Sequence, residues 1–252
     1  MENSFQKGGC MRPKVSILYA PGNNCHEETA DAFRLAGADP VITNLTDDLL
    51  SGKHKLYDCD LMALPGGFSF GDHLAAGRLV MIDLIHRLKD QLEEVKSRGI
   101  PIIGICNGFQ ALMNTGLLPG TGEVGHPTGI LDRNNSAVYE SRWCQIKVKA
   151  SPCIWTKGLE DEVLKIPVAH GEGRLRLSES FDEHQTVAQY YYDGEVEYPY
   201  NPNGSENNRA GICDDTGRIF GLMPHPERAI YPWLGSEDGL KVFKAGVDAV
   251  EG

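Results

Sequence analysis

The chain has 252 residues, a length that corresponds to one large domain or two small ones. Acidic side chains outnumber basic ones and give a net charge of −11, which disfavours a nucleic-acid-coating protein because such a protein needs a basic surface. Hydrophobic residues make up 41% and charged residues 23%, which is typical of a globular chain. No apolar run reaches the roughly 18 residues of a membrane span, and the polar start is unlike a signal peptide. We therefore expect a soluble, cytoplasmic protein that binds neither nucleic acid nor membranes.

Seven cysteines are scattered along the chain, and their pattern favours free thiols. The number is odd and no two form a Cys-x-x-Cys pair, so neither a disulfide framework nor a zinc site is indicated. Residues 120–125 formally match the dinucleotide fingerprint, but they follow a helix-like run and Pro119 rather than a strand, so we reject that match. The chain has no Gly-x-x-x-x-Gly-Lys-Ser/Thr loop and no His-Glu-x-x-His motif. We predict that it holds no metal and no cofactor.

Apolar runs and helical patterns alternate through the first half of the chain. The apolar runs predict strands over residues 15–20, 40–45, 61–64 and 102–105. The helical patterns cover residues 27–36, 74–98 and 109–117. This alternation predicts a parallel sheet, whose functional residues should lie at the carboxyl ends of the strands. The loops after residues 64 and 105 are therefore the places where we expect a site.

The second half of the chain is richer in strand-type segments. From about residue 137, further runs predict strands over residues 144–148, 166–169, 186–192 and 219–223, and a last helix covers residues 238–250. No linker separates the two halves. We expect a single domain over residues 13–252 with a β-rich second half, preceded by a polar extension over residues 1–12.

Cys106 has the sequence setting of a nucleophile. Residues 104–108 are Gly-Ile-Cys-Asn-Gly and lie between a predicted strand and a predicted helix. A sharp strand-to-helix turn lifts the nucleophile out of the sheet and leaves the next backbone N–H free to bind an oxyanion. The helix N-terminus also favours a thiolate. The alternative is that Cys106 is simply a small buried hydrophobic residue.

His225 and Glu227 are the candidates that could activate this thiol. A catalytic cysteine needs a histidine that a third group orients. Residues 224–228 are Pro-His-Pro-Glu-Arg, and in extended backbone His225 and Glu227 point to the same side. A surface histidine in a Pro-rich loop is the alternative. The other strand-end loop, residues 64–69, contains two consecutive glycines, which allow a backbone N–H to face a ligand but also suit a plain tight turn.

Together these residues resemble the triad-type (class I) glutamine amidotransferases, and in particular the glutaminase subunits of purine biosynthesis. Beyond the nucleophile and histidine segments, the similarity covers residues 65–72, 167–173, 200–205 and 234–240. The most specific motifs are Cys-Asn-Gly-Phe-Gln and Pro-His-Pro-Glu-Arg. The resemblance implies a flavodoxin-like α/β fold, with a mostly parallel sheet flanked by helices.

The resemblance also implies roles for individual residues. Cys106, His225 and Glu227 would form a catalytic triad that hydrolyses glutamine to glutamate and ammonia. The oxyanion would be bound by the backbone N–H groups of Gly67 and Asn107. The residues that resemble the lining of the glutamine pocket are Gln110, His170, Gly171 and Glu172.

A partner protein is the last implication of the resemblance. Ammonia would pass to a synthetase subunit that binds ATP and Mg²⁺ and converts formylglycinamide ribonucleotide to formylglycinamidine ribonucleotide, and a small third subunit would complete the enzyme. Two alternatives remain on the same type of sheet. One is a different cysteine hydrolase, such as a peptidase, although the adjacent His225 and Glu227 argue against it. The other is a non-enzymatic binding module with a structural Cys106.

Overall fold

The computed structural model describes residues 12–67, 78–120 and 123–251. Four expectations fall wholly or partly outside these residues. They are the polar extension, of which only Arg12 is described, the glycine loop beyond Gly67, residues 74–77 of the expected helix over 74–98, and residues 121 and 122 of the rejected dinucleotide match. Among the described residues, no helix is both long enough and apolar enough to cross a membrane.

Parallel strands form one half of the main sheet. Their order is β2 (Asp39–Asn44), β1 (Lys14–Tyr19), β3 (Leu61–Leu64), β4 (Ile102–Ile105) and β11 (Ile219–Leu222). Every residue of β3 and β4 is buried, as expected for central parallel strands that are covered on both faces. The predicted strand positions are confirmed to within a residue, and so is the flavodoxin-like beginning of the strand order.

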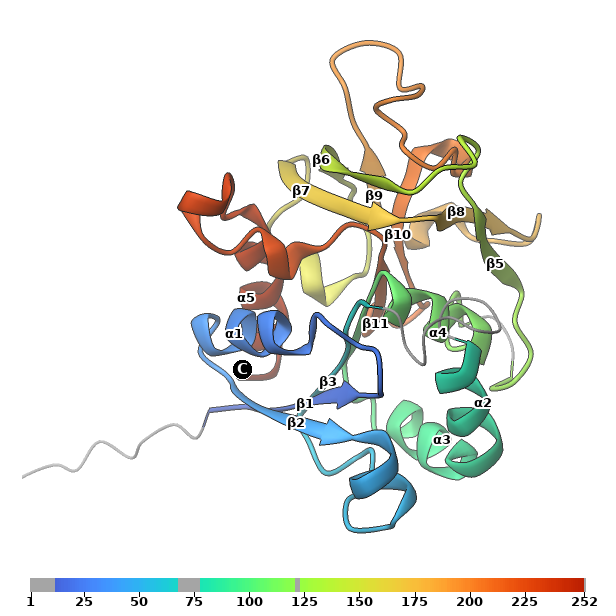
Figure 1. Cartoon of the computed structure of the whole chain (residues 1–252), viewed down its shortest axis with the longest axis vertical. Coiled ribbons are helices and arrows are strands. Elements are labelled where there is room, and N and C mark those ends of the chain that lie inside the picture. Colours follow the sequence, from blue (N-terminus) through green and yellow to red (C-terminus); the bar gives the residue numbers. More distant parts are fainter. Residues whose placement is uncertain (1–11, 68–77, 121–122, 252) are drawn as a thin grey trace, which may run out of the picture.

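Helices cover both faces of this parallel half. In Figure 1, α1 (His26–Leu35) lies beside α5 (Asp238–Glu251), above β1 and β2, whereas α2 (Arg78–Arg87), α3 (Lys89–Ser97) and α4 (Asn107–Thr115) lie together at the right. The single helix expected over residues 74–98 is wrong, because the chain breaks at Leu88, whose φ is −127°. The apolar periodicity persists through the break, since Leu84, Leu88 and Leu92 are all buried, and the sequence has no Pro or Gly there to signal it.

Antiparallel strands continue the sheet in the second half of the chain. After β11 the order is β10 (Arg209–Cys213), β9 (Thr186–Tyr190), β6 (Glu140–Val148) and β7 (Val163–His170). A separate antiparallel pair consists of β5 (Gly129–Arg133) and β8 (Glu172–Leu177). The β-rich second half is confirmed, but β5, β8 and β10 were not expected. Their sequences are short, carry Gly or Arg, and have no clear apolar alternation.

Short turns of other helix types complete the chain. A π-helical turn, η1 (Leu45–Leu50), follows β2, and 3₁₀ turns occur at η3 (Ile154–Thr156), η4 (Glu183–Gln185), η5 (Glu206–Asn208), η6 (Pro226–Arg228) and η7 (Pro232–Leu234). Of these, η6 matters most for the site because it directly follows the carboxyl end of β11.

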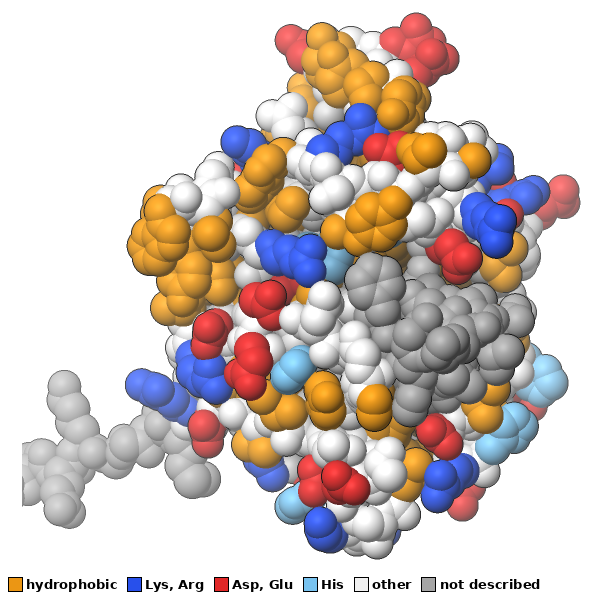
Figure 2. Space-filling model, in the orientation of Figure 1, with side chains coloured by type: hydrophobic (Ala, Val, Ile, Leu, Met, Phe, Trp, Pro, Cys, Tyr) orange, Lys and Arg blue, Asp and Glu red, His pale blue; other side chains and the backbone are white. Residues whose placement is uncertain are grey.

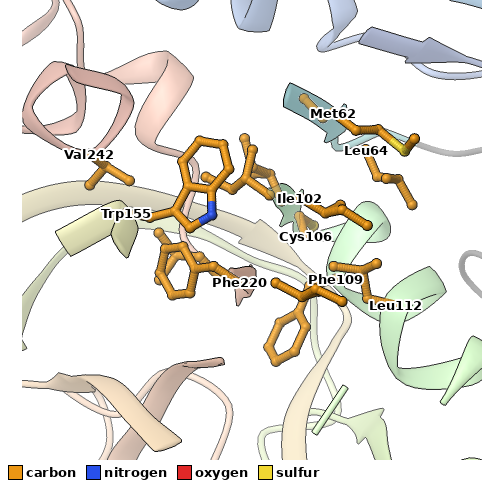
Figure 3. Close-up of a cluster of buried hydrophobic side chains, with 14 of the residues drawn as sticks. Met62, Leu64, Ile102, Cys106, Phe109, Leu112, Trp155, Phe220 and Val242 are labelled. Carbon is orange, nitrogen blue, oxygen red and sulfur yellow. The ribbon is translucent and has the colours of Figure 1, made fainter. Parts of the chain in front are cut away.

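A continuous hydrophobic core lies between the sheet and its helices. Figure 3 shows Phe109 and Leu112 of α4 facing Leu64 and Ile102 of the central strands, with Cys106 among them. Cys106 is 6% exposed, so it lies at the border of the core rather than on the surface. The carboxyl ends of β3, β4 and β11 are therefore fixed by packing, and the loops that follow them start from rigid positions.

Candidate active site

The turn at Cys106 has the geometry of a nucleophile elbow. Cys106 has a φ of +50°, which is uncommon for a residue with a side chain. Its N–H donates to the carbonyl of Leu222 at 2.8 Å, and its own carbonyl accepts from the N–H of Gln110 at 3.0 Å. A Cβ on Gly108 would lie 1.9 Å from the carbonyl oxygen of Leu64, so α4 starts directly against β3. This close approach holds the strained turn in place.

His225 and Glu227 form a buried hydrogen-bonded pair. Nδ1 of His225 lies 2.6 Å from Oε1 of Glu227, and each residue is only 1% exposed. The backbone N–H of His225 donates to the carbonyl of Pro167 at 2.8 Å, which anchors the loop to β7. Burial lowers the pKa of His225, but the Glu227 carboxylate and Cys106 outweigh it and raise the pKa well above its ordinary value. The pair therefore favours an imidazolium whose second nitrogen, Nε2, is free to act.

Gly66 lies between the histidine and the cysteine. A Cβ at this position would be 2.7 Å from Cε1 of His225 and 3.5 Å from Cβ of Cys106. Both side chains therefore pack against the same backbone segment of the loop after β3. Nε2 of His225 is buried and makes no direct hydrogen bond to the described residues. The arrangement brings Cys106, His225 and Glu227 together, and their catalytic roles stay a prediction.

Gly67 and Asn107 are the residues whose backbone N–H groups are expected to bind the oxyanion. Gly67 has a φ of +126°, a conformation that favours glycine, and it follows Gly66 in the loop that packs on Cys106 and His225. Asn107 is the first residue of α4 and directly follows Cys106 in the chain. Asn107 is therefore adjacent to Cys106 in the chain, Gly67 lies in the loop whose Gly66 packs on Cys106, and the role of both as oxyanion donors stays a prediction.

The residues expected at the glutamine pocket lie where α4 meets β7 and β8. Nε2 of Gln110 donates to the carbonyl of Glu172 at 2.6 Å, so these two expected residues are in direct contact. The Cys106 thiol lies 3.7 Å from the carbonyl of Ala169, which precedes His170. Gly171 joins β7 to β8 between them.

The side chain of His170 is held inside the protein. Its Nδ1 lies 3.1 Å from Oδ1 of Asn134, and its carbonyl accepts from Nδ2 of the same asparagine at 2.8 Å. Burial lowers the pKa of His170 to about 3, so its imidazole is neutral at pH 7. This placement favours a supporting role for the imidazole, with the backbone of this segment facing the site.

Two residues near the proposed triad, Cys25 and Tyr139, were not identified from the sequence. Cys25 is fully buried, and its thiol accepts a hydrogen bond from Nη2 of Arg228 at 3.0 Å. Tyr139 lies beside Gly171, and burial together with Cys106 raises the pKa of its phenol. Cys25 follows β1, a third parallel strand that ends at the same edge of the sheet. The rule that pointed to the other two loops could have found it.

One cluster near the triad has metal-ligating atoms. The thiol of Cys25, the imidazole of His225 and the carboxylate of Glu227 offer atoms within 4.8 Å of one another. Part of this cluster already has partners, because Nδ1 of His225 bonds to Oε1 of Glu227 and the cation of Arg228 donates to the Cys25 thiol. A positive guanidinium at this point opposes a second cation. The prediction that the chain holds no metal therefore stands as a prediction.

An apolar surface borders the site. A cavity of about 600 Å³ is lined by Ala169 and Glu227 and by the apolar side chains of Tyr231 and Leu234. Figure 2 shows hydrophobic side chains gathered at the left, where η7 lies in Figure 1, and Trp233 of that turn is 77% exposed. Exposed aromatic groups of this kind are typical of surfaces that contact other proteins.

The comparisons with known proteins decide the family. Residues 12–246 match the CobB/CobQ-like glutamine amidotransferase domain. The subunit PurQ of phosphoribosylformylglycinamidine synthase from Methanococcus maripaludis is 44% identical over 240 residues, which are 91% of this chain and 87% of the relative. This chain belongs to the PurQ family of glutamine amidotransferases.

Further relatives agree with this family. PurQ of Dehalococcoides mccartyi is 41% identical over 93% of this chain and 96% of its own length. A chain in the solved structure of PurLQS from Thermotoga maritima matches with a TM-score of 0.78 and 34% identity, covering 95% of this chain and 99% of that one. Membership of the PurQ family favours an amidotransferase over the two alternatives on the same sheet, a different cysteine hydrolase and a non-enzymatic module.

Proposed function

We propose that this chain is the glutaminase subunit of phosphoribosylformylglycinamidine synthase. It hydrolyses glutamine at Cys106 and supplies the ammonia to a synthetase subunit. The observation that carries the proposal is the buried contact of 2.6 Å between His225 and Glu227 in a chain of the PurQ family. His225 and Cys106 both pack against Gly66, so the pair lies next to the thiol. Nucleophile, base and orienting carboxylate are the parts that amide cleavage by a cysteine needs.

The first half of the reaction forms a thioester. The thiolate of Cys106, whose proton is held on Nε2 of the His225 imidazolium, attacks the side-chain amide carbon of glutamine. The carbonyl oxygen becomes an oxyanion, which the N–H groups of Gly67 and Asn107 stabilise. The imidazolium, held by Glu227, then protonates the amide nitrogen, the C–N bond breaks, and ammonia leaves. A γ-glutamyl thioester remains on Cys106.

The second half of the reaction frees the enzyme. His225, now neutral, takes a proton from a water molecule, and the hydroxide attacks the thioester carbon. The same two N–H groups stabilise the second oxyanion. Collapse breaks the C–S bond, releases glutamate, and returns the Cys106 thiolate beside the protonated His225. The segment of Gln110 and residues 170–172 would hold the amino acid part of glutamine, with Tyr139 at the side of the pocket.

The ammonia is consumed on another polypeptide. The synthetase subunit would bind ATP and Mg²⁺, activate the amide oxygen of formylglycinamide ribonucleotide, and replace it with the ammonia nitrogen. A small third subunit would take part in the complex, as the name PurLQS suggests for the Thermotoga maritima assembly. Ammonia that escaped into water would be protonated and lost as a nucleophile, so the partner should also activate the glutaminase.

The test uses the complex reconstituted from this chain and its synthetase. The variant Cys106→Ala should lose glutamine-dependent product formation by about a thousandfold or more, because the covalent nucleophile is gone. With a high concentration of an ammonium salt in place of glutamine, the same complex should still aminate formylglycinamide ribonucleotide. The matched control is Cys59→Ala, whose thiol lies at the carbonyl of Leu56, 3.3 Å away, and outside the site.

Two results would overturn the proposal. A complex that carries Cys106→Ala and still hydrolyses glutamine at a near-native rate would exclude Cys106 as the nucleophile. Loss of the ammonium-dependent reaction in a complex that remains assembled would show that Cys106 acts outside glutamine cleavage. Assembly is measured by size-exclusion chromatography with light scattering on the same samples.

A further inference from the structure

Asn23 connects the loop after β1 to the glycine loop after β3. It is 8% exposed, and its Oδ1 accepts a hydrogen bond from the N–H of Ala20 at 2.9 Å. This bond fixes which way the amide faces. Nδ2 then donates to the carbonyl of Gly66 at 3.2 Å and, more weakly, to that of Pro65 at 3.4 Å. Neither Asn23 nor these contacts have a part in the reaction as proposed above.

The contact at Gly66 determines where the next N–H points. The carbonyl of Gly66 and the N–H of Gly67 belong to one peptide unit, which is planar and trans, so the two bonds point in opposite directions. When Asn23 holds the carbonyl on its own side, the N–H of Gly67 must face the other side, away from Asn23. Cys106 lies against this loop on the side where Gly66 also meets His225.

The peptide unit needs such a restraint because its own sequence does not supply one. Two consecutive glycines have more accessible backbone conformations than any other pair of residues, and a rotated peptide would turn the donor away. Packing supplies part of the restraint, since a Cβ on Gly67 would lie 2.6 Å from the backbone nitrogen of Asn24. The side chain of Asn23 supplies directional hydrogen bonds to the peptide itself.

We propose that Asn23 is a positioning residue that holds the Gly66–Gly67 peptide with its N–H directed at the oxyanion formed on Cys106. The proposal rests on the glutaminase function proposed above. Asn23 touches neither glutamine nor the thiol, and it acts only through the peptide that it binds. Its loss should therefore lower the rate of the chemical steps that form an oxyanion and leave the nucleophile itself intact.

The decisive variant is Asn23→Asp in the reconstituted complex. The new carboxylate can still accept from Ala20, but it presents an oxygen where Nδ2 donated, and that oxygen repels the carbonyls of Pro65 and Gly66. We expect kcat for glutamine to fall about 100-fold, as when one oxyanion donor is removed, with KM for glutamine changed less than threefold. Asn23→Ala, which removes the donor without repulsion, should give a smaller loss in kcat.

A second measurement separates positioning from a general disturbance of the site. Iodoacetamide alkylates Cys106 by displacement at a saturated carbon, a reaction that forms no oxyanion. Its rate at Cys106 should therefore stay within threefold of the wild-type rate in both Asn23 variants. A purely structural role for Asn23 would instead change the alkylation rate and kcat together.

The chain offers a matched control in Asn201. This residue is 7% exposed, its Oδ1 accepts from the N–H of Gly204 at 2.9 Å, and its Nδ2 donates to the carbonyl of Ser205 at 3.0 Å. Asn201→Asp therefore makes the same change in a similar loop, where the carbonyl that loses its donor belongs to Ser205 rather than to Gly66. It should lower the unfolding temperature as Asn23→Asp does and leave kcat within threefold of wild type.

Each outcome has a distinct meaning. A kcat for Asn23→Asp within threefold of wild type would overturn the proposal, and so would a loss of kcat that Asn201→Asp shares. A parallel fall in Cys106 alkylation would also overturn it. If Asn23→Asp does not fold, Asn23→Ala is judged by the same two rates. A failure of the glutaminase function would appear elsewhere, because glutamine hydrolysis would then survive Cys106→Ala in an otherwise wild-type chain.

Discussion

Replacing Gly66 with alanine should damage the histidine rather than the fold. The new Cβ would lie 2.7 Å from Cε1 and 3.2 Å from Nδ1 of His225, whereas ordinary contact begins near 3.4 Å. The ring or the loop must therefore move by about 0.7 Å, the difference between the first distance and an ordinary contact. Gly66 is not among the residues with positive φ, so alanine meets no backbone strain there.

A shift of this size is large for this site. The bond of 2.6 Å between His225 and Glu227 cannot absorb it without breaking or turning the imidazole. Misplacement of a catalytic group by about 1 Å can cost roughly 100-fold in rate. We therefore expect Gly66→Ala to lower kcat by about 10- to 100-fold, a rise in the activation free energy of about 1.4 to 2.7 kcal/mol.

The assay is glutamate release by the reconstituted complex, with thermal unfolding measured on the same preparations. The control is Gly158→Ala, which adds a methyl group in open space at a φ of +83°. That change should cost stability through backbone strain and leave kcat unchanged, so a loss of stability alone cannot explain a slow Gly66→Ala. A folded Gly66→Ala complex with native kcat would refute the proposed contact between the loop and the histidine.

Two further predictions concern the thiols and the triad. Burial raises the pKa of Cys25, Cys59, Cys144 and Cys213, with a hydrogen bond to Cys153 as the first cause at Cys213. Mass spectrometry should therefore show Cys106 alkylated faster than these thiols at pH 7, and His225→Ala should remove the difference; equal wild-type rates would contradict this. Glu227 helps to raise the pKa of His225, so the pair stabilises the folded wild type as long as His225 is protonated. This stabilisation is complete below pH 6.5 and is lost as the pH rises through the raised pKa. Glu227→Gln should therefore lose most stability below pH 6.5 and least at high pH. Urea unfolding at several pH values measures this, and a loss that grew with pH would be inconsistent with it.

The residues of the proposed triad could be picked out from the sequence because each of them has a local pattern. Cys106 has glycines two residues to either side between an apolar strand and a helix, and His225 and Glu227 lie two residues apart after another strand. Strand ends are also visible in the sequence, since β3 and β4 are continuous apolar runs bounded by Pro and Gly. Patterns of this kind need no knowledge of which strands are neighbours.

The supporting residues could not be found in that way, because their contacts depend on strand order. Asn23 meets Gly66 only because β1 lies beside β3, with Ile17 paired to Ala63. Cys25 meets Arg228 across 203 residues of sequence. The pattern of a single segment contains no information on either contact. The break at Leu88 was missed for a related reason, because the apolar periodicity continues through it.

The register of the sheet decides whether the site exists at all. Leu64 pairs with Gly104 in one parallel ladder, and Leu222 pairs with Ile105 in the next. Gly66, Cys106 and His225 follow these paired positions by only a few residues, so their distances are set by the ladders. A slip of one residue would move a strand end by about 3.3 Å, more than the 2.6 Å that joins His225 to Glu227. The α4 side chains that hold these strand ends are Leu112, packed against Gly104 of β4, and Phe109, packed against Gly221 of β11. They therefore serve the chemistry as directly as they serve stability, and changes that loosen this core should lower glutamine hydrolysis before the chain unfolds.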